Sequence, residues 1–319
     1  MNILHVTASM DPQAGGVCQA VRTMIVGLDS RGVHSEVASL DDPAAAYVAA
    51  ASFTLHALGP GKGPWAYSPR LMPWLDANIS RFDAIIVHGL WLSTSYAACK
   101  AWLRRGNSKT RLYVMPHGML DPYFQRAPGR RLKAARNWLY WKLLEGAVIN
   151  EATGVLFTCE EECRLAREPF RPYRPQRELV VGLGVEEPPA FAPAMRTALA
   201  EALPAAAEQP YLLFISRIHE KKGIDLLVNA YVEGAAGPGG PPLVVAGPGL
   251  DTAYGQAVRS LAAGPRRRGG VSGHADRRGQ VGRVLRSGGL RAAQPPGKLR
   301  HCRGGSLGLR QTRAYFQPD

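Results

Sequence analysis

The sequence predicts an α/β protein built from two doubly wound, Rossmann-like domains, of which the second is incomplete. Three observations lead to this fold class. Short apolar runs alternate with segments of helical length through the first 187 residues. The alternation stops at a proline- and alanine-rich stretch and restarts at about residue 210. From Pro265 onward the chain shows neither the period of a strand nor that of a helix.

The predicted first domain, residues 1–187, begins as a strand–helix–strand unit. A strand at 2–8 leads into a polar loop, and a helix is expected from Val17 to about Arg31, where Gly32 ends it. Further strands are expected at 34–40, 84–90, 111–118, 154–159 and 178–184. These runs are continuously apolar, which is typical of parallel strands covered on both faces. We therefore expect a parallel sheet with helices on both sides.

The predicted second domain, residues 210–263, follows a linker at 188–209 and repeats the same order of elements. A strand is expected at 211–217, a helix at 223–235, a strand at 242–249 and a helix at 253–263. Residues 264–319 form an Arg- and Gly-rich tail that is expected to be irregular. The second domain is therefore expected to be partial.

Most of the net positive charge of the chain lies in this tail. The chain carries 39 basic and 25 acidic residues, a net charge of +14. The tail from Pro265 holds 13 of the basic and 2 of the acidic residues, which leaves 26 against 23, or +3, for the body. A pI near 9.9 would normally favour a nucleic acid or an anionic membrane as partner. Because the charge comes from one segment, the body gives no such signal.

The five cysteines are odd in number and scattered, so we expect free thiols in a reducing compartment and no metal site. The apolar start of the chain is too short for a signal peptide and is expected to be a strand. No apolar run approaches the roughly 20 residues of a membrane span. We therefore expect a cytoplasmic protein, and peripheral contact with the inner face of the membrane stays open.

Candidate functional residues follow the predicted strands, where open α/β sheets place their ligands. Gly15 and Gly16 precede the first helix, whose free N–H groups and dipole favour an anion, and a plain tight turn is the alternative. His117, in Pro-His-Gly at the end of strand 111–118, is placed to hydrogen-bond a sugar hydroxyl or a developing charge. His88 holds the same kind of position one strand earlier, as a candidate substrate contact. A structural role stays open for both histidines.

Two cations follow the first strand of the second domain. Arg217 ends this strand, and Lys222 with Gly223 opens the next helix, so two positive charges meet a helix N-terminus. The spacing R-x4-K-G directly after an apolar strand favours a diphosphate site over a solvated loop.

The stretch 130–144 interleaves cations with tryptophan, leucine and tyrosine. A basic, Trp-rich amphipathic helix of this kind can lie on an anionic membrane. A packed helix with snorkelling cations is the other interpretation, and the composition favours it.

The segment that holds Arg217 and Lys222, FISRIHEKKGIDLLVNAY, resembles the donor-binding segment of GT-B glycosyltransferases, in particular the retaining group-1 (family 4) enzymes. The other stretches that are similar to this family, in the same order, are Gly15-Gly16, PHGMLDP (116–122), LGVE (183–186) and LVVAGPG (243–249). The resemblance covers about residues 1–263 and rests on the order and spacing of these motifs together.

The resemblance implies that the N-terminal domain takes the acceptor and the C-terminal domain takes a nucleotide-sugar. It implies that Arg217 and Lys222 hold the donor diphosphate, and that Gly15 and Gly16 touch the phosphates from the other side. His117 is implied to be the catalytic residue that contacts the transferred sugar. Neither a metal nor a cofactor beyond the nucleotide-diphosphate sugar is implied, because cations and a helix N-terminus neutralise the leaving group.

One motif of the family has no match in this chain. The family carries an E-x7-E motif whose acidic residues hold the donor sugar and ribose. The tail, however, fits a family sequence whose DNA is translated in the wrong frame. In the alternative frame, each codon consists of bases two and three of one observed codon and base one of the next. Residues 288–316 then allow EAFVLPSHQENFGIAVVEALACGKPVLIS, and residues 271–287 allow FLGMLTGAAKWGAFYGA. We therefore expect a frameshift, one base inserted or two lost, between about Ala263 and Val271.

The sequence thus predicts a sugar-transferring enzyme of the kind used in polysaccharide biosynthesis, truncated by frameshift and without activity in this form. The acceptor is expected to be a saccharide or a lipid-linked acceptor. Two other functions stay open. One is an RNA-binding protein that uses the Arg/Gly-rich tail. The other is a membrane-surface module that binds the acceptor through residues 1–187.

Overall fold

The computed structural model describes residues 1–263 apart from 107–108, 128, 186–188, 204–208 and 235–240. The chain divides into two compact units, the first at Met1–Val185 and the second beginning at Glu186. The predicted Arg- and Gly-rich tail at 264–319 lies outside the described residues. The predicted linker at 188–209 is only partly described, and it contains a helix.

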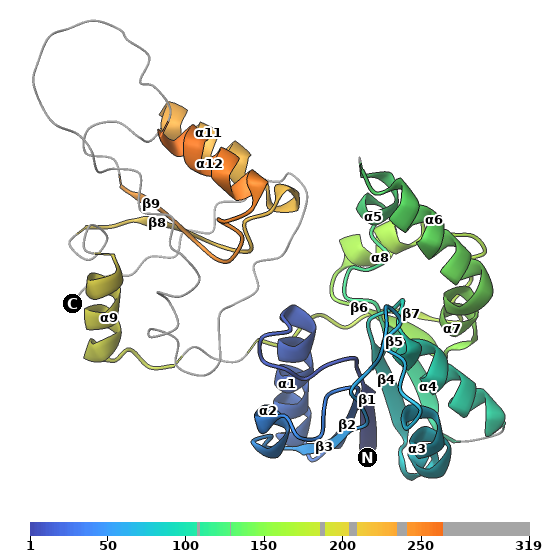
Figure 1. Cartoon of the computed structure of the whole chain (residues 1–319). Helices are drawn as coiled ribbons and strands as arrows, with labels where there is room; N and C mark the ends of the chain where they lie inside the picture. The colour runs from blue at the N-terminus through green and yellow to red at the C-terminus, as the bar shows by residue number, and fades with distance from the viewer. Residues whose placement is uncertain (107–108, 128, 186–188, 204–208, 235–240, 264–319) are drawn as a thin grey trace, which may run out of the picture. The chain divides into compact units, whose positions relative to one another are not determined.

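The first unit is built on a seven-stranded parallel sheet (Figure 1). The strands are β1 Asn2–Val6, β2 His34–Ser39, β3 Thr54–Ala57, β4 Ala84–His88, β5 Arg111–Met115, β6 Gly154–Phe157 and β7 Glu178–Val180. They lie in the order β3-β2-β1-β4-β5-β6-β7, and every neighbouring pair is parallel. This is the strand order of a doubly wound, Rossmann-like fold. The predicted α/β class is confirmed.

Helices cover both faces of this sheet because its strands carry apolar side chains on both sides. On one face, α1 (Gly16–Asp29) packs over the side chains of Ile3 and Ile86. On the other face, a larger core forms around Leu4 and Val87. The helices that contribute to this larger core are α3 (Leu71–Asn78), α4 (Ser93–Arg104), α7 (Gly146–Glu151) and α8 (Glu160–Ala166).

Shorter elements complete the first unit. They are α2 (Ala46–Ala49), the 3-10 helix η1 (Ile79–Arg81), α5 (Tyr123–Arg126), α6 (Arg131–Tyr140) and the π-helical turn η2 (Trp141–Glu145). The stretch expected to be one helix at 130–144 is thus α6 followed by η2, which continues directly into α7. Trp141, at the start of η2, is fully buried and stacks on Phe170 with ring centroids 4.8 Å apart. This packing places one end of the stretch in the core.

The described part of the second unit contains one pair of parallel strands, β8 (Leu212–Ile215) and β9 (Leu243–Ala246). The helices α11 (Ile224–Gly234) and α12 (Ala253–Ala263) lie side by side and pack on this pair around Ile224 and Val258. The helix α9 (Pro193–Ala202) contributes Leu199 to a small cluster with Val244 of β9. The short 3-10 helix η3 (Glu220–Lys222) precedes α11.

The two strands of this unit differ in burial. All four residues of β9 are buried, whereas Leu213 and Ile215 of β8 are 51% and 44% exposed. In the described residues β8 pairs with β9 alone. A strand with an unpaired edge and exposed apolar side chains is a template for pairing with other chains. The edge of β8 is therefore a surface of the described unit at which association is expected.

We expect the Leu213→Lys variant to aggregate more slowly than the parent chain, because a lysine at a strand edge opposes edge-to-edge pairing. The measurement is the rate of light-scattering increase at fixed concentration. Leu226→Lys is the matched control, since Leu226 is 67% exposed but lies on α11 rather than at the strand edge. Equal protection by both variants would show that general charge, not the β8 edge, controls association.

Candidate functional site

The carboxyl ends of β1 and β4 define the candidate site. The direction of the strand order reverses between these two strands. From β1 the sheet grows toward β2 and β3, and from β4 it grows in the opposite direction toward β5. The helices that follow them, α1 and α4, pack on opposite faces of the sheet. Ligands of open α/β sheets bind where loops diverge in this way. The candidate residues of the first unit lie at this edge.

Gly15 forms the N-cap of α1, between β1 and the helix. Its φ of 104° is strained for any residue that carries a Cβ atom. An atom at the Cβ position would meet nothing within 4 Å, so the backbone here is open to approach. In the described part of the chain no side chain caps this helix. The N-terminus of α1, which begins with Gly16, has the geometry of an anion site.

The buried carboxylate of Asp41 fixes the loop that leads to Gly15. It accepts hydrogen bonds from Ser9 Oγ at 2.6 Å, Met10 N at 2.7 Å and Tyr47 Oη at 2.9 Å. Burial and this last bond raise the pKa of Tyr47 to about 12, so its hydroxyl remains a donor. The sequence analysis missed Asp41, although an acidic residue directly after the strand 34–40 was a usable signal.

His5, His88 and His117 form a continuous row of imidazole rings. His5 Nδ1 lies 2.9 Å from His88 Nε2, and His88 Nδ1 lies 3.0 Å from His117 Nε2. The rings stack with centroids 5.2 and 5.3 Å apart. The structure thus brings together the two histidines expected at this edge and adds His5, which the sequence analysis did not single out.

Burial keeps this row uncharged. Loss of water lowers the pKa of His5 and of His117 to about 4, and for His117 the nearby charge of Glu162 opposes this fall. The pKa of His88 is held well below its ordinary value by burial and by the two neighbouring rings. Both ring nitrogens of His88 are bonded to other histidines, so a direct contact from His88 to a ligand requires one of these bonds to break.

The loop that carries His117 is held by Glu162 of α8. One oxygen of this carboxylate accepts from Gly118 N at 2.6 Å, and the other accepts from Thr158 N and Oγ1 at 2.8 and 2.5 Å. His117 itself has a φ of 53°, in the left-handed region that non-glycine residues seldom occupy. A residue held in such a conformation by its surroundings is a common feature of functional sites.

Glu145 holds the loop that follows β4. This carboxyl is fully buried and accepts from Trp91 N at 2.9 Å and Ser95 Oγ at 2.7 Å. Burial raises the pKa of Glu145 to about 7. Trp91 has a φ of 72°, which this hydrogen bond helps to fix. The π-helical turn η2 ends at Glu145, and such turns occur often at functional sites.

The expected diphosphate-binding cations lie in the second unit. Arg217 follows β8, and Lys222 ends η3 directly before Gly223, whose φ is 62°. Both cations are exposed and form no ion pair within the described residues. Gly247, after β9, lies so close to this loop that a Cβ atom would fall 1.8 Å from the carbonyl oxygen of Ser216. The glycine-containing loop therefore packs directly against the segment that carries Arg217.

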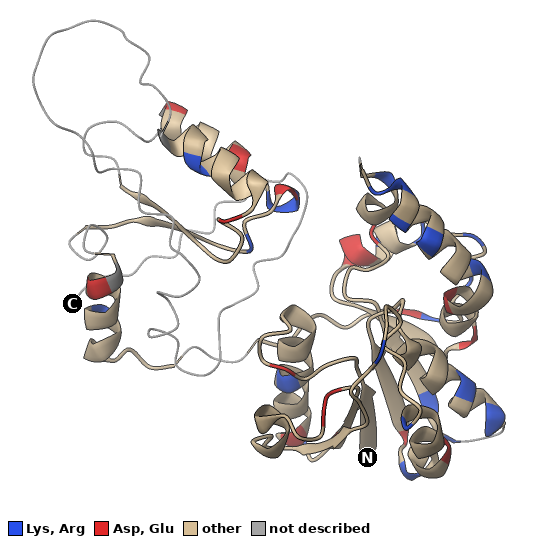
Figure 2. Cartoon of the chain, in the orientation of Figure 1, with Lys and Arg blue, Asp and Glu red and all other residues tan. Residues whose placement is uncertain are grey.

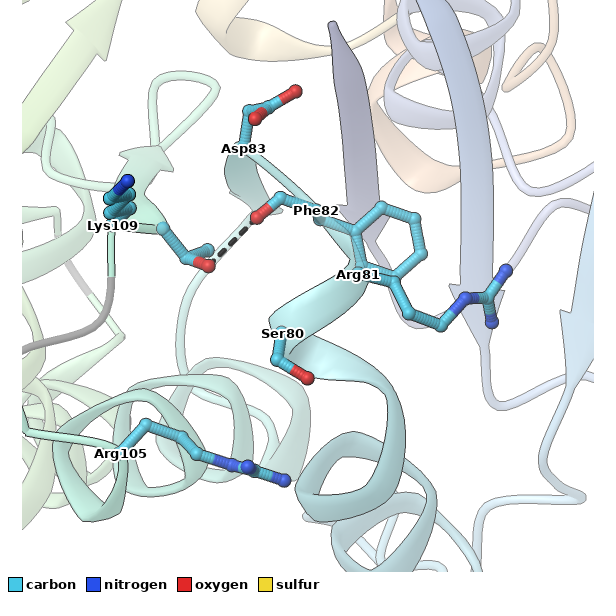
Figure 3. Close-up of a pocket in the computed structure, with 7 residues that line it drawn as sticks. Ser80, Arg81, Phe82, Asp83, Arg105 and Lys109 are labelled. Atoms are coloured by element: carbon cyan, nitrogen blue, oxygen red, sulfur yellow. Dashed lines mark hydrogen bonds between the residues drawn. The ribbon is translucent and has the colours of Figure 1, made fainter.

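A surface pocket of the first unit lies away from these residues (Figure 3). Its walls include Ser80, Arg81, Phe82, Asp83, Arg105, Lys109 and Thr110. Asp83 and Thr110 directly precede β4 and β5, so the pocket lies at the amino ends of these strands. It is therefore at the edge of the sheet opposite to the histidine row. In the part of the chain that the structure describes, no group of three or more His, Cys, Asp or Glu is arranged to hold a metal ion.

Several basic positions lie along α6 (Figure 2), and exposed apolar residues lie on α6 and η2. Leu132 and Leu143 are 88% and 67% exposed, and Trp138 and Leu139 are about half exposed. Arg131 and Lys133 are also exposed. None of the described helices has the length and apolar character needed to cross a membrane.

The parallel sheet and its strand order are those of the Rossmann-like domains of the GT-B fold class. Residues 15–184 match the glycosyl transferase 4-like domain, and the chain belongs to that family. No curated protein matches the chain.

Solved structures share this fold at low sequence identity. A glycosyltransferase from Rickettsia africae ESF-5 is 15% identical, with a TM-score of 0.52 over 82% of this chain and 64% of that chain. Anabaena Alr3699/HepE in complex with UDP is 14% identical, with a TM-score of 0.53 over 82% of this chain and 66% of that chain. The catalytic domain of starch synthase IV from Arabidopsis thaliana, bound to ADP and acarbose, is 14% identical, with a TM-score of 0.50 over 82% and 71%. The chain thus spans less than two thirds of the first two proteins.

We expect the free energy of unfolding to fall as the pH is lowered from about 6.5 to 4. In the unfolded chain these histidines bind protons in this range, whereas in the folded chain they do not. Each such proton lowers the free energy of unfolding by at most about 1.4 kcal/mol per pH unit. Glu145 opposes this effect, because its raised pKa makes the folded chain bind a proton that the unfolded chain releases between pH 4.5 and 7. The Glu145→Gln variant should therefore show a steeper loss.

Urea unfolding of both proteins at half-unit steps between pH 4.5 and 6.5 measures these slopes. Glu160→Gln, a change at an exposed residue of α8, is the control and should leave the slope unchanged. A slope that is equal or shallower in Glu145→Gln would contradict the protonated state assigned to Glu145.

Proposed function

We propose that this chain transfers a sugar from a nucleotide-diphosphate sugar to a saccharide or lipid-linked acceptor, in the cytoplasm. The observation that carries the proposal is the match of residues 15–184 to a glycosyltransferase family, together with a free helix N-terminus and an uncharged histidine at the carboxyl edge of the sheet. Two proteins of the same fold are solved with UDP or with ADP, which supports a nucleotide donor.

In this proposal the bond between the anomeric carbon and the diphosphate oxygen breaks, and the acceptor oxygen forms a bond to the same carbon. The proton of the acceptor hydroxyl passes to the departing diphosphate, which gains negative charge as it leaves. Arg217 and Lys222 of the second unit stabilise this charge without a metal ion. The free helix N-terminus at Gly15 and Gly16 of the first unit is the other candidate anion site. The resemblance to family 4 enzymes supports transfer with retention of configuration.

His117 contacts the transferred sugar in this proposal. Because its pKa is lowered to about 4, the imidazole is neutral at physiological pH and acts by hydrogen bonding rather than as a cation. Its left-handed backbone and the bond from Gly118 to Glu162 fix the position of the ring before the substrate binds. Preorganised groups of this kind lose little entropy when the substrate arrives.

We also propose that residues 264–319 are encoded out of frame, so that the second domain is truncated. The alternative reading of 288–316 supplies the E-x7-E motif, ENFGIAVVE, that the chain otherwise lacks. The exposed β8 fits this proposal, because the first strand of a doubly wound domain lies inside its sheet and needs a neighbour on each side.

Sugar transfer tests the function and the frame together. A chain restored to the alternative frame after Ala263 should release nucleotide diphosphate from a set of UDP-, GDP- and ADP-sugars in the presence of acceptor. The 319-residue chain should show no transfer above background. Mass spectrometry of the acceptor identifies the product.

In the restored chain we expect Arg217→Ala and Lys222→Ala each to lower kcat/KM by about 10²–10³-fold, the usual effect of removing one charge-stabilising group. Arg196→Ala, at an exposed cation on α9 of the same unit, is the control and should change little. Normal transfer by both site variants would exclude the proposed diphosphate site.

A second proposal concerns the surface of α6 and η2, which we propose lies against an anionic membrane. Leu132, Leu139 and Leu143 recur at spacings of seven and four, so they share one side of the helical stretch. Exposed leucines flanked by Arg131 and Lys133 match the composition of a helix that lies in a membrane interface.

Vesicle flotation tests this contact. We expect the chain to float with vesicles that contain phosphatidylglycerol and not with phosphatidylcholine alone. Each basic residue near an anionic surface contributes about 1 kcal/mol, so Arg131→Glu with Lys133→Glu should weaken partitioning at least about 10-fold. Arg31→Glu, at an exposed site beyond α1, is the control. Flotation that is unchanged in the double variant would remove α6 as the membrane contact.

A further inference from the structure

The histidine row runs from the interior of the sheet to its carboxyl edge on one face. His5 lies in the middle of β1 opposite Ile86, and His88 lies two residues further along β4, so both point to the same side. His88 is opposite Met115, and His117 follows Met115 by two residues. The row therefore crosses β1, β4 and the loop after β5, at the point where the strand order reverses.

Each of the two contacts in the row requires one proton between its two nitrogens. A neutral imidazole carries one N–H, so three neutral rings carry three protons and two of them lie inside the row. The third lies at one end, on His5 Nε2 or on His117 Nδ1. His88 donates from one ring nitrogen and accepts at the other. Both hydrogen bonds must therefore be donated in the same direction along the row. Two states result, each with every ring protonated on the same type of nitrogen.

The two ends of the row differ in their surroundings. His5 is fully buried, and its Nε2 has no hydrogen-bond partner within the described residues. A proton on this atom would be an unpaired buried N–H group, which folded proteins almost always avoid. His117 Nδ1 also lacks a partner among the described residues, but His117 is only partly buried. A proton there can be satisfied by water or by a ligand.

The carboxylate of Glu162 adds a second reason for this orientation. It holds Gly118 N next to His117, and its negative charge acts on the His117 ring in the direction that favours a bound proton. A negative charge near one end of the row stabilises the state that places the unshared N–H at that end. Both effects thus favour protonation of His117 on Nδ1.

We propose that His5 and His88 are positioning residues that hold His117 in the neutral form protonated on Nδ1, so that His117 presents an N–H donor at the carboxyl edge of the sheet. The row makes this donor permanent, because reversing it would move all three protons and leave one unpaired inside the core. The recipient of the hydrogen bond is an oxygen of the transferred sugar, and this last step rests on the proposed function.

The tautomers can be measured directly in the full 319-residue chain. Two-bond ¹H–¹⁵N correlation spectra of a sample labelled at histidine separate a protonated ring nitrogen from a bare one. The signals of His117 are identified by their loss in His117→Gln. We expect His5, His88 and His117 to be neutral and protonated on Nδ1 at pH 7.5. Protonation of His117 on Nε2, or a cationic ring, would overturn the proposal.

Two substitutions of His5 test the coupling between the ends of the row. Asn at this position can donate from its amide nitrogen to His88 Nε2, as His5 Nδ1 does, whereas Leu cannot. We expect His5→Asn to keep the His117 tautomer, and His5→Leu to lose the single Nδ1-protonated signal. A His117 signal that is the same in both variants would overturn the role of His5. If His5→Leu does not fold, the parent chain and His5→Asn still decide the orientation.

A kinetic readout separates this proposal from the proposed function. In the frame-restored chain, His5→Leu should lower kcat about 10-fold with KM unchanged, and His5→Asn should restore it. If the spectra show the expected tautomers and no nucleotide-sugar is used, the row stands and the proposed function fails. If sugar is transferred and His117 is protonated on Nε2, the function stands and the row as proposed is wrong.

Discussion

The parallel pairing of β1 with β4 is the contact on which the rest of the site depends. It places two strands side by side whose following helices pack on opposite faces, so their loops diverge at the carboxyl edge. The same register sets His5 diagonally across from His88. A slip of one residue would turn every side chain of β1 to the other face. The contact of His5 with His88 thus follows from this strand pairing, and the pairing of β4 with β5 extends the row to His117.

Three carboxyl side chains, of which Asp41 and Glu145 are buried and Glu162 is partly buried, give this edge its rigidity. Asp41 holds the loop before α1, Glu162 holds the loop that carries His117, and Glu145 holds the loop after β4. Each of these carboxyls accepts from backbone N–H groups, and at the buried Asp41 and Glu145 breaking such a bond would leave a buried group unsatisfied at a cost of about 1–3 kcal/mol. The loops at the carboxyl edge are therefore fixed by these three side chains. Fixed loops suit the proposed function, in which a neutral imidazole and a helix N-terminus act on one substrate.

The sequence was sufficient to predict the α/β class, the parallel sheet and six of its strands, because long apolar runs leave few alternatives. It did not reveal β3, Thr54–Ala57, whose four residues are half-buried or exposed and carry no strong pattern. His5 lies inside an apolar run, and the sequence does not indicate that its partner is His88, 83 residues away. The partners of Glu145 are 50 and 54 residues away, so sequence spacing carried no information about them. Contacts of this range depend on the tertiary fold rather than on local pattern.

We propose that residues 210–263 are the part of the second domain that remains in the original reading frame. The DNA sequence tests this proposal most directly. The gene should be sequenced from the codon for Leu261 through the stop. For the alternative frame to encode the family motif, certain third bases that the observed residues leave free are fixed: Gln294 must be CAG, Lys298 AAA, His301 CAT and Gln311 CAA. Finding these codons, with one base in excess or two missing between about Ala263 and Val271, would confirm the account. The opposite third bases would contradict it, because the alternative frame would then read Asn, Ser, Thr and Arg at those places.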